Sequence, residues 1–295
     1  MSNQKPVKYI SIKKTKTTGL IIRWVIAVVL IAFSIFPVLW VISASINPVN
    51  DLATQQLIPK NASLVNFKAL FGNPIFPFWT WMKNSLIVSS IATILTLSLT
   101  TMAAFAFSRF RFRGRKTMLK GILLIQVFPN LLAMVAIFTI IKQMGDVFPA
   151  IGLNTLPGLI LVYLGGAMGM NIWLMKGYMD TIPRDIDESA HVDGATDWEV
   201  FTKLILPLLR PILVVIGILS FIGTYGDFII ARTLLTQSAK QTVMVGLQIF
   251  TAGQYTKNWG VFAAGALVAA LPIMTIYLIL QDQIVGGLTQ GAVKG

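Results

Sequence analysis

The chain has 295 residues, of which 55% are hydrophobic and only 12% are charged, and its formal net charge is +13. Soluble domains carry about 25% charged residues, so this composition, with a mean hydropathy of +0.75, indicates an integral membrane protein without a separate soluble enzyme domain. The sequence contains no cysteine and a single histidine, His191, which excludes disulfides, thiolate chemistry and any metal site built from several histidines.

Six apolar segments are long enough to cross a bilayer. A transmembrane helix needs roughly 20 apolar residues, because lipid cannot satisfy a free backbone N–H or C=O group. The predicted spans are residues 20–46, 84–107, 118–141, 157–175, 211–231 and 260–281. Residues 1–19 and 282–295 are then terminal tails on one all-α bundle of six transmembrane helices.

The first apolar segment has an alternative interpretation as a signal peptide. Basic residues precede it, and Ser43-Ala44-Ser45 resembles a small-residue cleavage site. Its apolar run is longer than the roughly 7 to 15 residues of a signal-peptide core. We therefore interpret residues 20–46 as a span.

A basic stretch follows the second span. Residues 109–116 read RFRFRGRK, and such a mixture of cations and aromatics can indicate nucleic-acid binding. The same stretch lies directly after a span, where Arg stems snorkel and anionic headgroups attract positive charge. We interpret it as a determinant of topology and expect no nucleic-acid partner.

The distribution of Lys and Arg between alternate loops sets the orientation. With the N-terminus inside, 17 of the 24 basic residues fall on the cytoplasmic side. Cytoplasmic loops carry the excess of positive charge in membrane proteins. Both termini and the loop 176–210 are therefore predicted to be cytoplasmic.

The loop 176–210 is acidic and has the signals of two short helices. Pro183 suits a first helical position, and acidic residues follow it in the early turns, where the helix dipole favours negative charge. Gly194 can take the left-handed conformation that ends a helix. Thr196 and Glu199 form a capping box that begins a second helix. We expect a helix, a sharp turn and an amphipathic helix.

An apolar stripe is predicted on this second helix, formed by Trp198, Phe201, Leu204, Ile205 and Leu208. Two interpretations follow from the pattern. The unit is either an interfacial loop lying against the bundle or a rigid element that docks into a cytosolic motor. Periodicity alone does not choose between them.

Candidate residues for other functions are few. No G-x-x-x-x-G-K-[ST] loop is present to cradle ATP, and no serine comes with a recognisable base, so we expect no catalytic activity in this chain. An ion-coupled carrier requires ionisable residues within the membrane. Asp227 lies near the outer end of the fifth span, either on the transport pathway or as an interfacial carboxylate near Arg232.

The residue order in the loop resembles the EAA motif of ABC importer permeases, written E-A-A-x3-G-x9-I-x-L-P. Ser189 replaces an alanine of the motif and Leu204 replaces its isoleucine, and both replacements are close in size. In that family the loop forms a coupling helix that sits in a groove of the ATP-hydrolysing subunit. The coupling residues that the resemblance implies are Glu188, Ser189, Ala190, Gly194, Leu204, Leu206 and Pro207.

Further stretches are similar to carbohydrate importer permeases of the maltose and maltodextrin (MalG) type. These stretches are residues 112–121, 151–154, 163–166 and the C-terminal residues 287–295. The resemblance implies a type I importer permease (MetI-like) bundle that forms half of a pore in a bacterial cytoplasmic membrane. Its substrate would be a malto-oligosaccharide, with a galacto-oligosaccharide or another glycoside as the alternative.

The same resemblance implies partners and contact sites. The partners would be a second, non-identical permease, two copies of an ABC ATPase, an extracytoplasmic sugar-binding protein and membrane lipid. ATP and Mg would be held by the ATPase, and this chain would hold no cofactor and no metal. Expected contacts with the binding protein are Gly253, Gln254, Tyr255 and Thr256. Expected contacts of the C-terminal tail with the ATPase are Gln290, Gly291 and Lys294.

Overall fold

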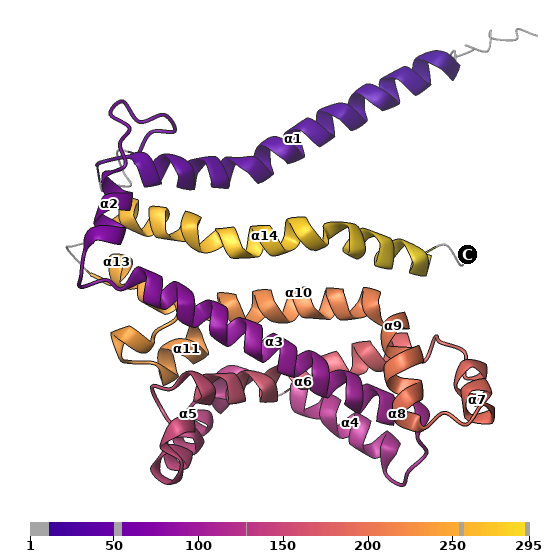
Figure 1. The fold of residues 1–295 in the computed structure, drawn as a ribbon. Helices are drawn as coiled ribbons and strands as arrows, with labels where there is room; N and C mark the ends of the chain where they lie inside the picture. Colours follow the sequence, from indigo (N-terminus) through magenta and orange to yellow (C-terminus); the bar gives the residue numbers. More distant parts are fainter. Residues whose placement is uncertain (1–11, 50–54, 128, 254–256, 293–295) are drawn as a thin grey trace, which may run out of the picture.

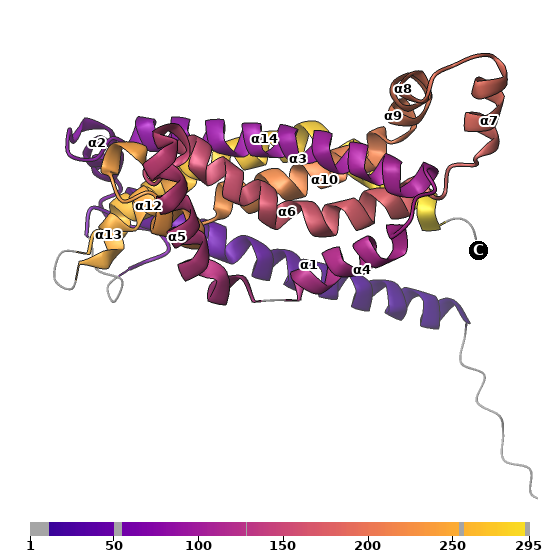
Figure 2. The same cartoon turned by 90° about the horizontal axis from the view of Figure 1, so that it is seen from below.

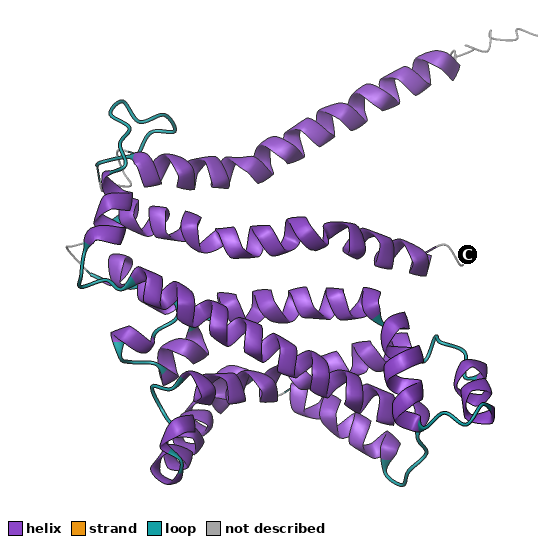
Figure 3. Cartoon of the chain, viewed as in Figure 1, coloured by secondary structure: helices purple, strands orange, loops and turns teal. Residues whose placement is uncertain are grey.

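The computed structural model describes residues 12–49, 55–127, 129–253 and 257–292. Figures 1 and 3 show that these residues form helices joined by turns and loops, and none of them lies in a strand. The long helices are α1 (Ile12–Ile46), α3 (Phe78–Arg109), α4 (Arg115–Gln126), α5 (Asn130–Val147), α6 (Leu156–Met179), α10 (Arg210–Gly226) and α14 (Trp259–Ala292). The all-α class that the composition predicts is confirmed.

Shorter elements connect these helices at the two ends of the bundle. At one end lie α7 (Asp185–Val192), α8 (Asp197–Glu199), the π-helical segment η2 (Val200–Ile205) and α9 (Leu206–Leu208). At the other end lie α2 (Val65–Gly72), η1 (Pro149–Ile151), α11 (Ile229–Leu234), η3 (Ser238–Lys240), α12 (Val243–Leu247) and α13 (Ile249–Ala252). Figure 2 shows α7 and α8 standing away from the long helices, so this unit forms a projection.

The predicted spans agree with the helices in most places. Within the described residues, three helices are long and apolar enough to cross a membrane, and up to five spans result if each of two bent pairs is counted as one. The predicted span 118–141 is not one continuous helix, because α4 ends at Gln126 and α5 begins at Asn130, just after Pro129. Proline has no N–H to donate and disfavours a helical conformation in the residue before it. The count of six crossings stays a prediction.

Two predicted helix ends also differ from the structure. α10 ends at Gly226, before the predicted boundary at residue 231, and α11 follows as a separate helix. α14 continues to Ala292, beyond the predicted boundary at residue 281, so most of the expected C-terminal tail is helical. Helix ends are the least certain part of a sequence-based prediction, because capping and packing decide them.

α3 lies at the centre of the bundle, with α6 and α10 packed against it. Its buried residues include many small hydroxyl side chains, among them Ser89, Thr96 and Thr100. Small side chains let helix backbones approach closely in membrane proteins. The Thr100 hydroxyl donates to the Thr96 carbonyl at 2.6 Å, so its burial leaves no unpaired donor.

α1 lies beside α14, at the edge of the bundle (Figure 1). None of its most apolar window is buried within the chain. A helix that is hydrophobic on all sides requires an apolar environment around it. The outer faces of α1 are therefore suited to contact lipid or another membrane protein.

Candidate functional site

α7 begins two residues later than the sequence predicts. Pro183 precedes the helix, which runs from Asp185 and carries the expected acidic residues in its first turn. The Arg184 carbonyl accepts the N–H groups of Asp187 (2.9 Å) and Glu188 (3.0 Å), so Arg184 takes the position before the helix. The negative charges still lie at the positive end of the helix dipole.

The turn after α7 has the predicted conformation. Gly194 has a φ of +85°, and its N–H donates to the His191 carbonyl at 3.0 Å. The Ala195 N–H donates to the Ala190 carbonyl at 2.9 Å. This pair of hydrogen bonds is a Schellman motif, the C-terminal cap that glycine favours. A Cβ atom on Gly194 would meet nothing within 4 Å, so the glycine is required for its backbone conformation and not for space.

The predicted capping box is confirmed at the start of the second helix. The Glu199 N–H donates to Thr196 Oγ1 (3.3 Å), and the Thr196 N–H donates to Glu199 Oε2 (3.1 Å). Lys203 Nζ lies 2.8 Å from Glu199 Oε1. The hydrogen bond from Lys203, followed by those from Thr196, lowers the pKa of Glu199 to about 2. The carboxylate therefore caps the helix in its ionised form.

The π-helical segment changes which residues of the second helix are buried. The Leu206 N–H donates to the Phe201 carbonyl, five residues earlier, and Pro207 follows with no N–H of its own. The wider turn places Phe201, Ile205 and Leu209 in the core, at intervals of four residues. The predicted stripe is therefore wrong at Trp198 and Leu208, which are 60% and 45% exposed.

A cluster of apolar side chains packs the segment from α7 to α9 against the bundle. The Phe105 ring of α3 lies 5.0 Å from the Phe201 ring, between centroids. Met175 and Met179 of α6 are fully buried in the same cluster. Ala190, Ala195 and Leu206 pack against it and are partly buried. Several positions of the motif therefore support the fold of the unit.

Charged side chains also fix α7 to the end of α3. Arg109 Nε and Asp187 Oδ2 lie 2.6 Å apart, and their side chains are only 7% and 11% exposed. Arg109 Nη2 donates to the Ile182 carbonyl (3.2 Å), and Arg184 Nη2 donates to the Ser108 carbonyl (2.8 Å). We call these four residues, Ser108, Arg109, Arg184 and Asp187, the α3–α7 clasp. Burial raises the pKa of the Asp187 carboxyl, against the opposing effect of Arg109.

Sequence reasoning missed the clasp. It interpreted Arg109 with its basic neighbours as a determinant of topology, whereas the structure buries Arg109 in an ion pair. The partner, Asp187, lies after three further long helices, and no local pattern connects the two residues. The one available signal was an Arg two residues after the end of a predicted span, on the same side of the membrane as the acidic loop.

Glu188 and Ser189 occupy the outer side of α7. Both are exposed, and the Glu188 carboxylate makes no hydrogen bond or ion pair with any residue that the structure describes. His191 Nδ1 lies 3.0 Å from the Ala195 carbonyl oxygen, and His191 Nε2 lies 3.4 Å from Asp197 Oδ1. The histidine thus connects the two helices, while Glu188 remains accessible to a partner.

The hydrogen bonds of Asp227 connect it to α6 and α11. Asp227 Oδ1 accepts hydrogen bonds from the Tyr163 hydroxyl (2.9 Å) and the Ala231 N–H (3.0 Å). No ion pair with Arg232 is found among the described residues. Asp227 therefore joins α6 to the start of α11.

At the opposite end of the bundle, α3 holds the segment from η3 to α12. Trp81 Nε1 donates to the Ser238 carbonyl (2.8 Å), Asn84 Nδ2 donates to the Gln241 carbonyl (2.9 Å), and Ser85 Oγ accepts the Val243 N–H (2.8 Å). These polar residues near the start of α3 had no assigned role in the sequence. They position the chain that leads to Gly253, where an extended conformation follows α13.

Most of the other residues predicted to contact partner proteins are not described by the structure. Gln254, Tyr255, Thr256 and Lys294 are not among the described residues. Gln290 and Gly291 lie in the last turns of α14. Among the residues searched, no group of three or more His, Cys, Asp or Glu side chains forms a metal site.

Fold and site define a multi-pass membrane protein that presents, at one end of its bundle, two short capped helices joined by a turn. The profile of the binding-protein-dependent transport system inner membrane components matches residues 97–290, which include this unit. The chain belongs to that family, and it is an inner-membrane permease.

Two relatives match nearly the whole chain. The maltose/maltodextrin transport system permease protein MalG of Vibrio vulnificus (strain YJ016) is 43% identical over 274 residues, covering 88% of this chain and 91% of the relative. The protein of the same name from Escherichia coli (strain K12) is 39% identical over 293 residues, covering 96% and 98%.

A solved structure has the same fold. A chain of a bacterial ABC transporter that imports the acidic polysaccharide alginate superposes with a TM-score of 0.76 at 22% identity, covering 94% of this chain and 99% of that chain. A chain of the alginate transporter in complex with its periplasmic protein has a TM-score of 0.67 at 17% identity.

Proposed function

We propose that this chain is a permease subunit of an ABC importer for maltose and malto-oligosaccharides, forming half of the translocation pore. The two MalG relatives support this proposal, because they match more than nine-tenths of their own length at about two-fifths identity. The chain has no phosphate-binding loop, so its energy comes from a partner ATPase that holds ATP and Mg. The chain itself is non-catalytic.

The partners proposed for the assembled transporter are a second, non-identical permease, two ATPase subunits and an extracytoplasmic sugar-binding protein. In this arrangement both termini and the α7–α8 unit face the cytoplasm, as the distribution of basic residues predicts. The segment that leads to Gly253 faces the binding protein. Gln290, Gly291 and Lys294 contact the ATPase.

α7 is the coupling helix in this proposal, and one observation carries that assignment. The unit is capped and packed on the bundle, yet it exposes Glu188 and Ser189, whose side chains have no partner within the described part of the chain. Gly194 sets the angle between the two helices. The conformation of these helices and their packing against the bundle depend on Ala190, Leu204, Leu206 and Pro207. Through the α3–α7 clasp, a displacement of α7 by the ATPase reaches the central helix α3 directly.

The experiment is ATP-dependent uptake of labelled maltotriose by the complete transporter in proteoliposomes, comparing Gly194→Val with Gly177→Val. Both glycines have space for a Cβ atom, but only Gly194 has a positive φ. We expect Gly194→Val to assemble, yet to lose uptake and substrate-stimulated ATP hydrolysis. Gly177→Val should retain both.

Normal uptake by an assembled Gly194→Val transporter would show that the unit is a passive connection. ATP hydrolysis without maltotriose uptake in the wild type would assign another glycoside, such as a galacto-oligosaccharide. Uptake driven by an ion gradient without the ATPase would identify an ion-coupled carrier. Each result separates one part of the proposal from the others.

A further inference from the structure

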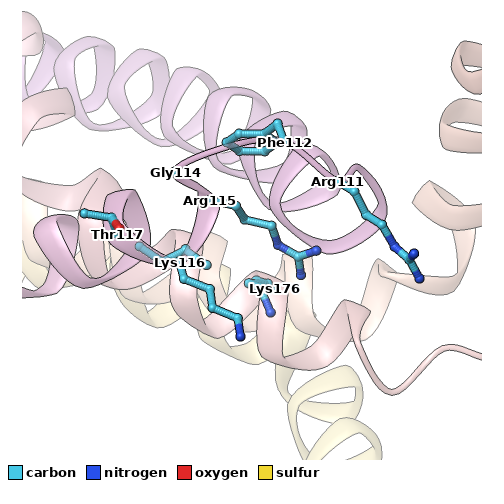
Figure 4. A pocket seen from close by; sticks show the side chains of 8 residues that line it. Arg111, Phe112, Gly114, Arg115, Lys116, Thr117 and Lys176 are labelled. Atoms are coloured by element: carbon cyan, nitrogen blue, oxygen red, sulfur yellow. The ribbon is translucent and has the colours of Figure 1, made fainter.

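A basic pocket lies beside the turn between α3 and α4, apart from the coupling surface. Its volume is about 560 Å³, and the cations that line it are Arg111, Arg115 and Lys116 from the turn and α4, and Lys176 from α6. Figure 4 shows these four basic side chains extending toward the same side of the turn. The pocket therefore gathers positive charge from two helices that are distant in sequence.

Much of this charge is not neutralised within the protein. Arg111 and Lys116 are exposed, and neither side chain forms a hydrogen bond or ion pair with the described residues. Lys176 pairs with Asp180, and Arg115 Nη1 donates to the Phe110 carbonyl at 3.2 Å. One carboxylate thus accompanies four cations, so the pocket attracts an anion.

The backbone of the turn adds to this preference. Gly114, with a φ of +85°, precedes α4, and no side chain caps the first turn of that helix. The N-terminus of a helix presents free N–H groups and the positive end of its dipole. Phosphate is a suitable ligand, because Arg binds its oxygens in a bidentate manner and Lys supplies a point charge.

The surface next to the pocket is apolar and exposed. Along α4, Met118 is 53% exposed, Leu124 is 73% exposed and Ile125 is 71% exposed, while Phe112 at the pocket is 40% exposed. Leu124 lies roughly 12 Å further along the helix than Lys116, at 1.5 Å per residue. If a phosphate in the pocket carried an acyl chain, that chain could therefore contact the exposed apolar side chains of α4.

We propose that this pocket binds the phosphate headgroup of an anionic phospholipid, whose acyl chains lie along α4. A dispersed excess of basic residues attracts anionic lipid only loosely, whereas four cations that line one pocket beside an exposed apolar helix define a specific site. The lipid would hold the turn between α3 and α4 against α6 through Lys176. The proposal concerns lipid recognition and is independent of which sugar is transported.

The test uses native mass spectrometry of the purified, assembled transporter, titrated with phosphatidylglycerol, with phosphatidylcholine and with inorganic phosphate. The test variant is Arg111→Gln/Lys116→Gln, and the matched control is Arg113→Gln/Lys120→Gln. Both variants remove the same charge from the same segment, but only the first pair lines the pocket. At about fivefold in affinity for each of two cations, we expect phosphatidylglycerol binding to weaken roughly 25-fold in the first variant alone.

The remaining outcomes would overturn the proposal in distinct ways. If both variants lost phosphatidylglycerol binding equally, the lipid would be attracted by positive charge in general. If neither variant lost it, the pocket would not be a lipid site. Inorganic phosphate that displaces phosphatidylglycerol at similar concentration would indicate a site for a soluble anion. Equal binding of phosphatidylcholine by the wild type would exclude recognition of charge.

Discussion

The two ends of α3 are held by different kinds of contact. At one end, the buried Arg109–Asp187 ion pair fixes α7, and at the other end neutral hydrogen bonds from Trp81, Asn84 and Ser85 fix the segment from η3 to α12. A buried ion pair loses hydration on both partners, so its net contribution is small while the loss of one partner is costly. Neutral hydrogen bonds instead each contribute about 1 kcal/mol. The comparison teaches that the α7 end adds one buried charge pair to its hydrogen bonds and apolar contacts, so the loss of one charged partner is costly there. At the opposite end, the polar contacts of Trp81, Asn84 and Ser85 are all neutral hydrogen bonds.

The largest effect is expected from breaking the clasp. Arg109→Gln leaves the Asp187 carboxylate buried without its partner, at a cost of about 3 kcal/mol in the free energy of unfolding. Arg109→Gln with Asp187→Asn should recover most of this loss, because no buried charge remains. Thermal unfolding of the solubilised transporter measures both.

A matched control uses the exposed ion pair in the same unit. Lys203→Gln removes the partner of Glu199, and a surface pair contributes only about 0 to 1 kcal/mol. If Arg109→Gln unfolds at the same temperature as Lys203→Gln, the clasp does not hold α7. If the double variant is no better than Arg109→Gln, the charge of Asp187 is not the cause.

A smaller loss of stability is expected when a side chain is added where the packing is already tight, at the Trp81 end of α3. A Cβ atom on Gly246 would lie 2.2 Å from Cδ2 of the buried Trp81 ring. Gly246→Ala should therefore destabilise by about 2 kcal/mol, because the ring or α12 must shift. Gly223→Ala is the control, since a Cβ atom there meets nothing within 4 Å. Equal melting temperatures of the two variants would contradict this account.

Asn154 tests the same end through hydrogen bonds alone. Its side-chain oxygen accepts the N–H groups of Thr236 (2.7 Å) and Gln237 (2.9 Å), and its φ of 58° is one that asparagine tolerates better than most residues. Asn154→Ala should destabilise by about 1 to 2 kcal/mol. Asn73→Ala, which removes one local hydrogen bond, should cost less. Greater loss in the control would refute the assignment.

The smallest effect is a dependence on pH at the capping box. The folded-state pKa of Glu199 is lowered to about 2, so its stabilisation is present above the unfolded-state value and is lost as the pH falls. Glu199→Gln should therefore be less stable than the wild type at about pH 6, and the difference should shrink toward about pH 3. Melting curves at several pH values measure it, and a constant difference would argue against the ionised cap.

The sequence predicted those features of the α7–α9 segment that depend only on a few neighbouring residues. The turn at Gly194 and the capping box at Thr196 require only a few consecutive residues, and both are present. The ion pair of Arg109 was missed, because its partner is brought near only by the packing of the whole bundle. The buried stripe was shifted, because the π-helical segment before Pro207 departs from the ordinary helical period.

Membrane helices were predictable for the same reason, since hydrophobicity is a property of each segment. The break before α5 was not, although Pro129 provided a signal, because proline is tolerated in many membrane helices. The partners of Asp227 were also out of reach, because Tyr163 lies on a different helix and the Ala231 N–H becomes available only where α11 begins. Of the site, therefore, the turn and the caps could be predicted, and the attachment to the bundle could not.

The length of α3 has a mechanical consequence. Its 32 residues form one helix without an internal proline, and at 1.5 Å per residue it measures about 48 Å, longer than the hydrocarbon core of about 30 Å. If α3 moves as one body about its contacts with α6 and α10, its two ends must move in opposite directions. An inward displacement of the α7 end would then carry the far end outward.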